Sequence, residues 1–323
     1  MATYTTYVPE NGAVGQREDL SNTIYNIAPT ETPVVSSIGK TKATATFHEW
    51  QTDDLSAANT DGLIEGADAA AASATPTVRV GNRTQIQGKT VHVSGTLDVV
   101  DKAGRKTETA YQLAKSGQEL KRDMEKTILS NIAQSAGTTT TARLLAGIQT
   151  WLKTNFVTMT DGVAPTTADG NNTRTAGATA AAFTEAKLKE CVKSVFENGG
   201  TPTLLVVPPT QKQVVSEFTG IAAQRYEAPK AKATTIIGAA DVYLSDFGTL
   251  SVVPDRFMTA DTTPDAEQAL VLDPTMASIA TLRPFQSQLL AKTGDSEKHP
   301  MLVEYTLAVN NEKAHGIVAD LAV

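Results

Sequence analysis

The clearest pattern along the chain is a helical stripe of apolar positions between residues 106 and 134. Lys115, Glu119, Arg122 and Lys126 occupy the opposite face, which is typical of an amphipathic helix. A helix of about 28 residues would be about 42 Å long, longer than an average globular helix. Because the stripe is narrow, it predicts a helix that covers a small sheet. The stripe consists of Ala110, Leu113, Gly117, Leu120, Met124, Ile128 and Ile132.

Two strand patterns flank a polar segment on the N-terminal side of this helix. Residues 42–52 and 77–100 alternate between apolar and polar positions, and neither run has a strongly apolar face. The segment between them is rich in Ala, Gly, Ser, Asn and Asp. The pattern predicts a long two-stranded ribbon with a flexible tip. Because an isolated ribbon is marginally stable in water, this one needs a surface from its own chain or from another.

The first 45 residues show no sustained helical or strand period. Pro9, Pro29 and Pro33 interrupt the segment, and only residues 20–27 could form a short helix. This is typical of an arm that is either disordered or ordered by lying on another surface.

The C-terminal half combines a compact α/β unit with a series of strands. Thr184 is a candidate N-cap, with Phe183 and Leu188 as a hydrophobic staple, for a helix that ends at residues 198–200. A low-complexity loop at 157–182 precedes this helix. After the helix come an apolar strand at 203–207 and a second helix from Pro208 to Phe218. A hairpin is predicted at 241–253, and further strands at 269–272, 278–282, 286–292, 301–310 and 316–321.

Composition and charge exclude several classes of protein. The 323 residues carry a formal net charge of −7 and no run of Lys or Arg, which argues against a dedicated nucleic-acid binder. No apolar stretch approaches the ~18 residues that span a bilayer, so no membrane partner is expected. The N-terminus lacks the pattern of a signal peptide, and the single cysteine, Cys191, fits a reducing compartment. The four histidines lack metal-ligand spacing.

One set of motifs follows the order found in the penicillin-recognising serine enzymes. Ser37 and Lys40 match S-x-x-K, residues 245–247 approach S-D-N, and residues 292–294 match K-T-G. In that chemistry the Ser attacks a carbonyl and the Lys, one helical turn later, takes its proton, so the first motif must begin a helix. Gly39 interrupts this motif, residues 41–46 favour a strand, and Phe247 replaces the required amide. A serine acyl-transfer enzyme at Ser37 and Lys40 stays an alternative.

The other motifs favour structural roles. Gly88-Lys89-Thr90 lacks the first glycine of a phosphate-binding loop and lies between strand patterns. The acidic residues of the 53–68 segment lack the ordered spacing of a calcium loop. Cys191 is predicted to be a core thiol, His48 has no companion nucleophile, and His315 fits a turn or packing position. We therefore predict no catalytic, cofactor-binding or metal site.

The parts of the chain differ in how much of their own apolar surface they can bury. The α/β unit and the long helix resemble an ordinary globular domain, whereas the arm and the ribbon cannot cover their own surface. Identical neighbours could supply the missing surface. The sequence therefore predicts an assembly in which each subunit ties several others. The alternative is a surface or decoration protein that forms only small oligomers.

Several blocks of sequence resemble the tailed-phage major capsid proteins of the SU10-like family. The resemblance extends from about residue 19 to residue 321 and is far more specific than any single motif above. Its blocks are DLSNTIYNIAPTETP (19–33), SIGK (37–40), TFHEWQTD (46–53), FTEA (183–186), DVYLSDFGTL (241–250), LRPF (282–285), AKTGDSEK (291–298) and NEKAHG (311–316).

This resemblance implies an α+β, HK97-like capsid fold. The implied organisation is an N-terminal arm at 1–41, an extended β-hairpin loop at 42–100, and a peripheral domain with a long spine helix at 101–140. An α/β axial domain would occupy 141–249, and strands at 250–323 would return to the peripheral domain and form the C-terminal segment. Deleting 1–41 should then leave a soluble subunit that cannot close shells.

The resemblance also implies a function without catalysis and without a cofactor. The chain would be a bacteriophage major capsid protein that self-assembles as hexamers and pentamers into an icosahedral head around double-stranded DNA, without specific recognition of that DNA. Other expected partners are a portal and, where they exist, scaffold or decoration proteins. Such a protein is made in the host cytoplasm and resides in the virion.

Overall fold

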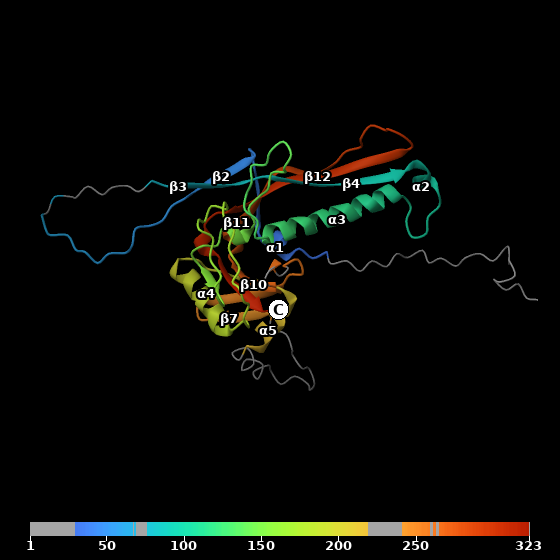
Figure 1. The fold of residues 1–323 in the computed structure, drawn as a ribbon. Helices are drawn as coiled ribbons and strands as arrows, with labels where there is room; N and C mark the ends of the chain where they lie inside the picture. Colours follow the sequence, from blue (N-terminus) through green and yellow to red (C-terminus); the bar gives the residue numbers. More distant parts are fainter. Residues whose placement is uncertain are drawn as a thin grey trace, which may run out of the picture.

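The computed structural model describes residues 30–66, 68, 76–218, 241–258, 261–262 and 265–322. These residues form two sheets, a two-stranded ribbon and five helices, with a compact body from which the ribbon and the longest helix extend in opposite directions (Figure 1). The first half of the chain forms α1 (Pro33–Ser37), β1 (Gly39–Lys42), β2 (Phe47–Thr52), β3 (Val78–Arg83), β4 (Gln85–Ser94), α2 (Gly95–Val99), α3 (Glu108–Leu129) and β5 (Phe156–Thr158). The second half forms α4 (Glu185–Glu197), β6 (Leu204–Val207), α5 (Pro209–Glu217), β7 (Val242–Ser245), β8 (Gly248–Pro254), β9 (Asp261–Thr262), β10 (Asp265–Leu272), β11 (Ala277–Ser287), β12 (Ser296–Val309) and β13 (Gly316–Ala322).

The long helix α3 lies along a four-stranded sheet with the order β1-β11-β12-β4. The sequence analysis predicted this helix over 106–134, and it is confirmed with shorter ends. Its N-terminus is capped by Asp98 of α2, whose carboxylate accepts hydrogen bonds from the backbone N–H groups of Glu108 and Thr109. At the other end the helix stops at Leu129, because Ser130 adopts an extended backbone conformation.

The second sheet has the order β5-β13-β10-β6-β8-β7, with β9 paired to β10. Its central strands are apolar on both faces because both faces are covered. Along β6, Leu204 and Val206 point into one core, whereas Leu205 and Val207 point into the other, as the two-residue period of a strand requires. The helix α4 packs on the second face through Leu188 and neighbouring apolar residues. The predicted α/β unit is therefore confirmed.

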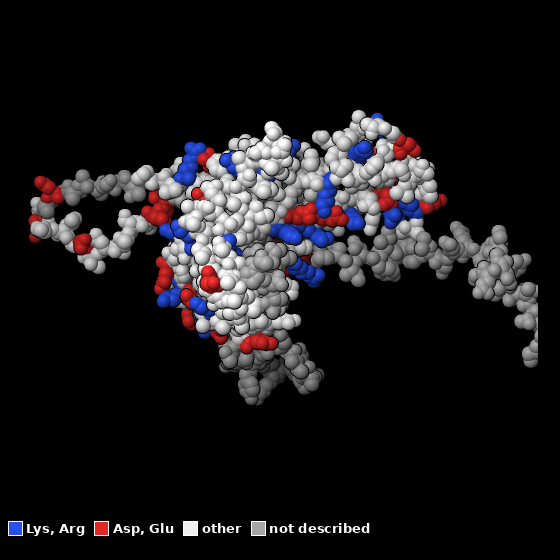
Figure 2. Space-filling model, in the orientation of Figure 1, with Lys and Arg blue, Asp and Glu red and all other residues white. Residues whose placement is uncertain are grey.

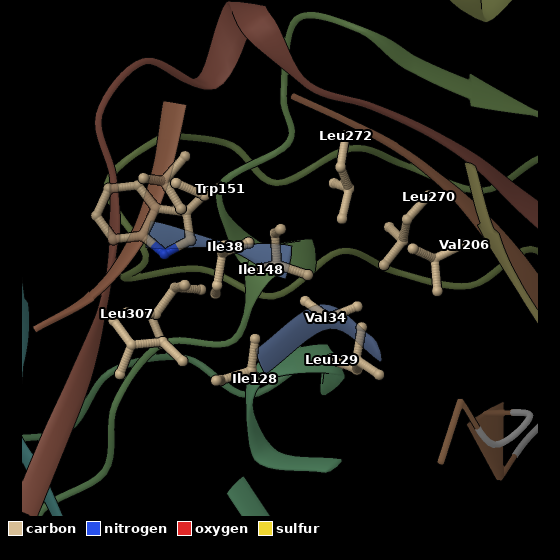
Figure 3. Close-up of a cluster of buried hydrophobic side chains, with 14 of the residues drawn as sticks. Val34, Ile38, Ile128, Leu129, Ile148, Trp151, Val206, Leu270, Leu272 and Leu307 are labelled. Atoms are coloured by element: carbon tan, nitrogen blue, oxygen red, sulfur yellow. The ribbon is translucent and has the colours of Figure 1, made fainter. Parts of the chain in front are cut away.

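The first core joins the two sheets into one body. Val34 and Ile38 of the α1 segment pack there with Ile128 of α3, Leu307 of β12 and Leu270 of β10 (Figure 3). Because residues 34 and 38 are 0% and 4% exposed, the chain from α1 onward belongs to the folded body. The predicted boundary of the arm at residue 41 falls inside β1.

The strands after residue 250 differ from the sequence-based prediction. A boundary at 249 falls inside β8, and β10 and β13 pair within the seven-stranded sheet beside β6. Of the strands that begin after residue 250, β11 and β12 join β4 in the sheet along α3, whereas β10 and β13 lie in the seven-stranded sheet, so the predicted return of strands at 250–323 to the peripheral domain describes β11 and β12. Strand periodicity does not encode which sheet a strand joins, because both sheets here bury two-residue repeats.

Three smaller predictions also change. Residues 95–99 were expected to continue a strand but form α2, because the Ser94 hydroxyl accepts a hydrogen bond from Leu97 N–H and begins a helical turn. Residues 286–292 are not a separate strand, since β11 runs to Ser287 and the chain then turns back into β12. The 157–182 loop begins with part of β5, which pairs with β13. The short helix expected at 20–27 lies outside the described residues.

Candidate assembly surfaces

The base of the ribbon is held firmly to the body. Asn82 of β3 is fully buried; its side-chain amide donates to Leu307 O at 2.8 Å and to Ala146 O at 3.1 Å, and its oxygen accepts from Ala146 N–H at 2.9 Å. The Trp50 ring of β2 lies 5.4 Å from the ring of Trp151 in the core. These contacts fix where the ribbon leaves the body, so the loop beyond it has a defined starting direction.

The loop that follows β2 is apolar, acidic and exposed. Leu55, Leu63 and Ile64 are 99%, 98% and 81% exposed. Large apolar side chains that are fully exposed in one segment are a feature of interaction surfaces. The 53–68 segment also carries five acidic residues and no Lys or Arg, namely Asp53, Asp54, Asp61, Glu65 and Asp68. This loop projects away from the rest of the described chain (Figures 1 and 2).

A shallow apolar groove runs between α3 and the outer part of the four-stranded sheet. Leu113, Ala114 and Gly117 form one wall, and Phe285 and Met301 form the other. Phe285 is 42% exposed. The exposed Lys121 of α3 lines the groove, and Figure 2 shows Lys and Arg side chains interspersed with acidic ones along the line of this helix.

Gly117 is unusual because it lies in the middle of the longest helix. A glycine there costs roughly 1 kcal/mol relative to alanine. The chain itself would accept a side chain at this position, since the nearest atom to an added Cβ is Met301 Sδ at 3.7 Å. A Cβ at residue 117 would thus fit in ordinary contact with Met301, and its absence lets another chain approach this part of the groove closely.

A buried ion cluster joins the four-stranded sheet to the base of the ribbon. Glu304 of β12 is 4% exposed and pairs with Arg283 at 2.7 Å and with Arg143. Its carboxylate also accepts a hydrogen bond from the Thr84 hydroxyl at 2.8 Å. One carboxylate therefore joins β12, β11 and the ends of the ribbon, which keeps the sheet rigid where α3 crosses it.

A second apolar surface lies at the β7 end of the seven-stranded sheet. Val242 and Leu244 of β7 are 55% and 61% exposed, on the strand face opposite the buried Tyr243. The ring of Phe247, in the turn after β7, lies 4.8 Å from the ring of Phe196 on α4. Val242 and Leu244 therefore form an exposed apolar edge, and Phe196 with Phe247 forms an aromatic contact between α4 and the β7–β8 turn.

The residues of the serine-enzyme motif set are not arranged as that chemistry requires. Ser37 is the last residue of α1, its hydroxyl donates to Pro33 O at 2.7 Å, and Lys40 lies in β1 rather than one helical turn later. The hydroxyl of Ser245 donates to Gly248 O at 2.8 Å in the β7–β8 turn. Lys292 pairs with Glu297 at 3.0 Å.

The other singled-out residues have structural partners. Lys89 of the Gly88-Lys89-Thr90 motif lies in β4 and pairs with Glu119 and Asp123 of α3, both at 3.1 Å. Cys191 is fully buried in the α4 core, and burial raises the pKa of its thiol to about 12. The His48 ring lies 5.9 Å from that of Trp50, on the ribbon.

His315 packs in the interior of the body, as the sequence analysis predicted. It is fully buried, and its Nδ1 accepts a hydrogen bond from Asp273 N–H at 3.2 Å. Burial lowers the pKa of this imidazole to about 4, so it is neutral at physiological pH.

The described part of the chain carries no candidate metal cluster and no candidate membrane span. It contains no group of three or more His, Cys, Asp or Glu side chains that could hold a metal ion, and the acidic residues of the 53–68 segment do not converge into one. None of its helices combines the length and the apolar character needed to cross a bilayer.

Sequence patterns missed several buried acids, among them three that hold distant parts of the chain together. Glu125, Glu304 and Asp320 are each less than 5% exposed, and each has charged or backbone partners. Glu125 carried the one usable signal, since it is three residues before Ile128 of the apolar stripe and therefore lies toward the buried side of the helix.

Comparison with known proteins decides what kind of chain presents these surfaces. The sequence model of the family described as SU10 major capsid protein matches residues 2–322. The chain belongs to this family. The major capsid protein of Escherichia phage Phieco32 is 39% identical over 122 residues, a match that covers 38% of this chain and 35% of that one. The chain thus aligns with about a third of the length of this curated relative.

Solved structures of low sequence identity share the fold. The capsid of an empty GTA particle superposes with a TM-score of 0.65 at 14% identity, covering 99% of this chain and all of that one. A structure from Mycobacterium phage Bobi gives a TM-score of 0.62 at 11% identity, with coverage of 99% and 100%. A holo-SrpI encapsulin complex from Synechococcus elongatus gives 0.56 at 10% identity, with coverage of 98% and 96%. The fold of this family member is therefore HK97-like, as the sequence resemblance implied.

Proposed function

We propose that this chain is a non-catalytic shell subunit, which assembles as hexamers and pentamers into an icosahedral head around double-stranded DNA. The observation that carries the proposal is the projecting 53–66 loop, whose apolar residues Leu55, Leu63 and Ile64 are 81–99% exposed. The described part of its own body leaves these side chains exposed, so we propose that another copy buries them. Membership of a major capsid protein family supports the same conclusion.

The groove along α3 is the surface that suits this loop best. It offers apolar walls at Leu113 and Phe285 to the apolar side chains of the loop. The exposed Lys121 in its lining complements a segment with five acidic residues and no basic one. We propose that the loop of one subunit lies in the groove of the next.

The contact would be modest in energy and specific in geometry. Burying Leu63 and Ile64 would contribute about 1.5–3 kcal/mol each before the cost of ordering the loop. The opposite charges would set register and partner choice more than affinity. A shell closes with such contacts because every subunit repeats them.

The acidic balance of the chain suits a container for nucleic acid. A net charge of −7 limits how tightly DNA would adhere to the protein, so packaged DNA would be enclosed without specific recognition. We place the assembled protein in the virion, after synthesis in the host cytoplasm. A portal, and scaffold or decoration proteins where they exist, are further proposed partners that rest on the family resemblance.

The domain organisation is proposed in a form adjusted to the observed elements. Residues 1–29 would be the arm, and the β2–β3 ribbon with its loop would be the extended loop. The helix α3 with β1, β4, β11 and β12 would form the peripheral domain. The seven-stranded sheet with α4 and α5 would form the axial domain, and its apolar β7 edge would face the centre of a hexamer or pentamer.

Replacing Leu63 and Ile64 by serine tests the proposed contact. We expect the double variant to assemble only at a protein concentration about tenfold or more above that of wild type, because losing 1.4 kcal/mol at a contact is worth about a factor of ten. Sedimentation velocity measures the assembled fraction. The matched control is Val163→Ser, which removes an apolar side chain that is 57% exposed elsewhere on the surface.

The reciprocal variant fills the groove instead. Gly117→Leu places apolar bulk at the groove floor, so it should impair assembly while the helix gains stability from loss of the glycine. Unchanged assembly of both the loop variant and the groove variant would overturn the proposed contact.

A further inference from the structure

Two buried carboxyl groups meet where the first described elements join the body. Glu125 of α3 and Asp255, which follows β8, are 0% and 1% exposed. Glu125 accepts hydrogen bonds from Val34 N–H at 2.7 Å through Oε1 and from Val35 N–H at 2.8 Å through Oε2. It therefore ties α1 to the long helix. Oδ1 of Asp255 accepts from Phe257 N–H at 2.7 Å.

The second oxygen of Asp255 points to a shared proton. Within the described residues, Asp255 Oδ2 is buried and has no donor when both carboxyl groups are ionised, because ionised carboxylates only accept hydrogen bonds. A proton on Glu125 would supply that donor. Burial, followed by the hydrogen bond with Asp255, raises the pKa of Glu125 to about 8 against the lowering effect of the two α1 N–H groups. The pair therefore holds one proton at pH 7.

Nearby cations do not neutralise the pair. The α1 segment, residues 33–37, has no ionisable side chain. On α3, Lys121 and Lys126 are exposed, and the guanidinium of Arg122 lies 5.6 Å from the Phe257 ring centre. Beside Asp255, Arg256 is exposed. From β12, the buried Tyr305 contributes a phenol whose pKa burial raises, so it is neutral as well. Asp255 is the charged neighbour that acts on Glu125.

We propose that the Glu125–Asp255 pair is a proton-dependent latch that holds α1 and β1 against the body. With one shared proton, Glu125 bridges Asp255 to the backbone of α1. When that proton passes to water, two buried negative charges face each other, and the contact opens so that water can reach them. The inference does not depend on the proposed function, because the latch lies within one chain.

The α1–β1 segment is the part of the chain that we expect to detach from the body when the latch opens. It has a five-residue helix that buries one side chain, Val34, and an edge strand whose four residues are all exposed. The other elements at the latch, α3 and β8, are paired or packed along their length. The latch therefore sets how firmly residues 33–42 are held to the body.

Hydrogen exchange of the full chain from pH 5 to pH 9 tests the latch. A carboxyl whose pKa rises on folding contributes stability that is full below its unfolded pKa and is lost as pH rises through the folded value. After correction for intrinsic exchange, opening of residues 33–42 should increase by up to about tenfold per pH unit between pH 5 and pH 8, and then level off. A flat profile in wild type would overturn the proposal.

Asp255→Asn provides the decisive variant. The asparagine oxygen can still accept from Phe257 N–H, and its NH2 group can donate to an ionised Glu125, so 33–42 should stay protected at pH 9 with no pH dependence. Asp246→Asn, in the exposed turn between β7 and β8, makes the same change of charge and should keep the wild-type slope. An Asp255→Asn profile with the wild-type slope would contradict the latch. Glu125→Gln, which also removes the titration, gives an independent second test.

Discussion

Asp320→Ala is expected to lower the free energy of unfolding by about 3–5 kcal/mol, because it removes one partner of a buried ion pair. Asp320 and Arg174 are both fully buried, with 3.7 Å between Arg174 Nη1 and Asp320 Oδ1. The same carboxylate accepts hydrogen bonds from the Thr158 hydroxyl at 2.5 Å and from Gly177 N–H at 3.0 Å. It thereby holds the 157–182 loop on the seven-stranded sheet.

The backbone at Asp320 adds to the expected loss. Asp320 has a φ of 62°, in the left-handed region, and it lies where the pairing of β13 with β10 shifts register. Aspartate and asparagine tolerate this conformation better than alanine, for which it costs roughly 1–2 kcal/mol. The irregular strand turns the carboxylate toward the loop instead of into either core.

Urea denaturation of the Asp320 variants checks this prediction. Asp320→Asn keeps the tolerance for the left-handed conformation but removes the charge, so it should lie between wild type and Asp320→Ala. The matched control, Asp246→Ala, removes an exposed aspartate and should change stability by less than about 0.5 kcal/mol. An Asp320→Ala protein within 1 kcal/mol of wild type, on the order of an ordinary point mutation, would contradict the proposed role of the ion pair.

Removing residues 1–29 is expected to leave a folded subunit that does not close shells, because the arm of the proposed organisation would be lost while the described body stays intact. Removing residues 1–41 should have a different result. It also deletes Val34 and Ile38 from the core, which costs about 3–6 kcal/mol for the two side chains, and it removes the donors to Glu125. The structure therefore changes the sequence-based expectation that a 1–41 deletion stays soluble.

Two measurements on each truncation distinguish these outcomes. Thermal unfolding followed by circular dichroism should show a wild-type midpoint for the 1–29 deletion and a strongly lowered one for the 1–41 deletion. Electron microscopy of the 1–29 deletion should show unassembled subunits or open fragments. Normal closed particles from that deletion would refute the role of the arm.

Local sequence patterns predicted the elements whose burial is visible in the spacing of their own apolar residues. The α3 stripe, the staple of Phe183 and Leu188, and the doubly apolar strand at 204–207 depend on spacing alone, so they could be read before the structure was known. The ends of α3 could not be predicted in this way, because the N-terminal cap comes from Asp98, ten residues upstream. The sheet to which each later strand belongs also depends on contacts distant in sequence.

The assembly surfaces were predicted only in part. The lack of an apolar face in the ribbon and the acidic composition of the loop indicated that the loop needs a partner. The groove could not be predicted, because it combines α3 with Phe285 and Met301 from strands more than 160 residues later. The buried acids were missed for a related reason: in Asp320 and Glu304, the partner that explains the charge is far away in the sequence.

Electron microscopy of the purified wild-type protein, with its mass by light scattering, tests the central claim most directly. Subunits that tie several neighbours through loop, groove and arm should form closed shells built of hexamers and pentamers, with masses far above that of one 34.1 kDa chain. The account would be contradicted by a protein that is folded by circular dichroism but stays monomeric or stops at small closed oligomers.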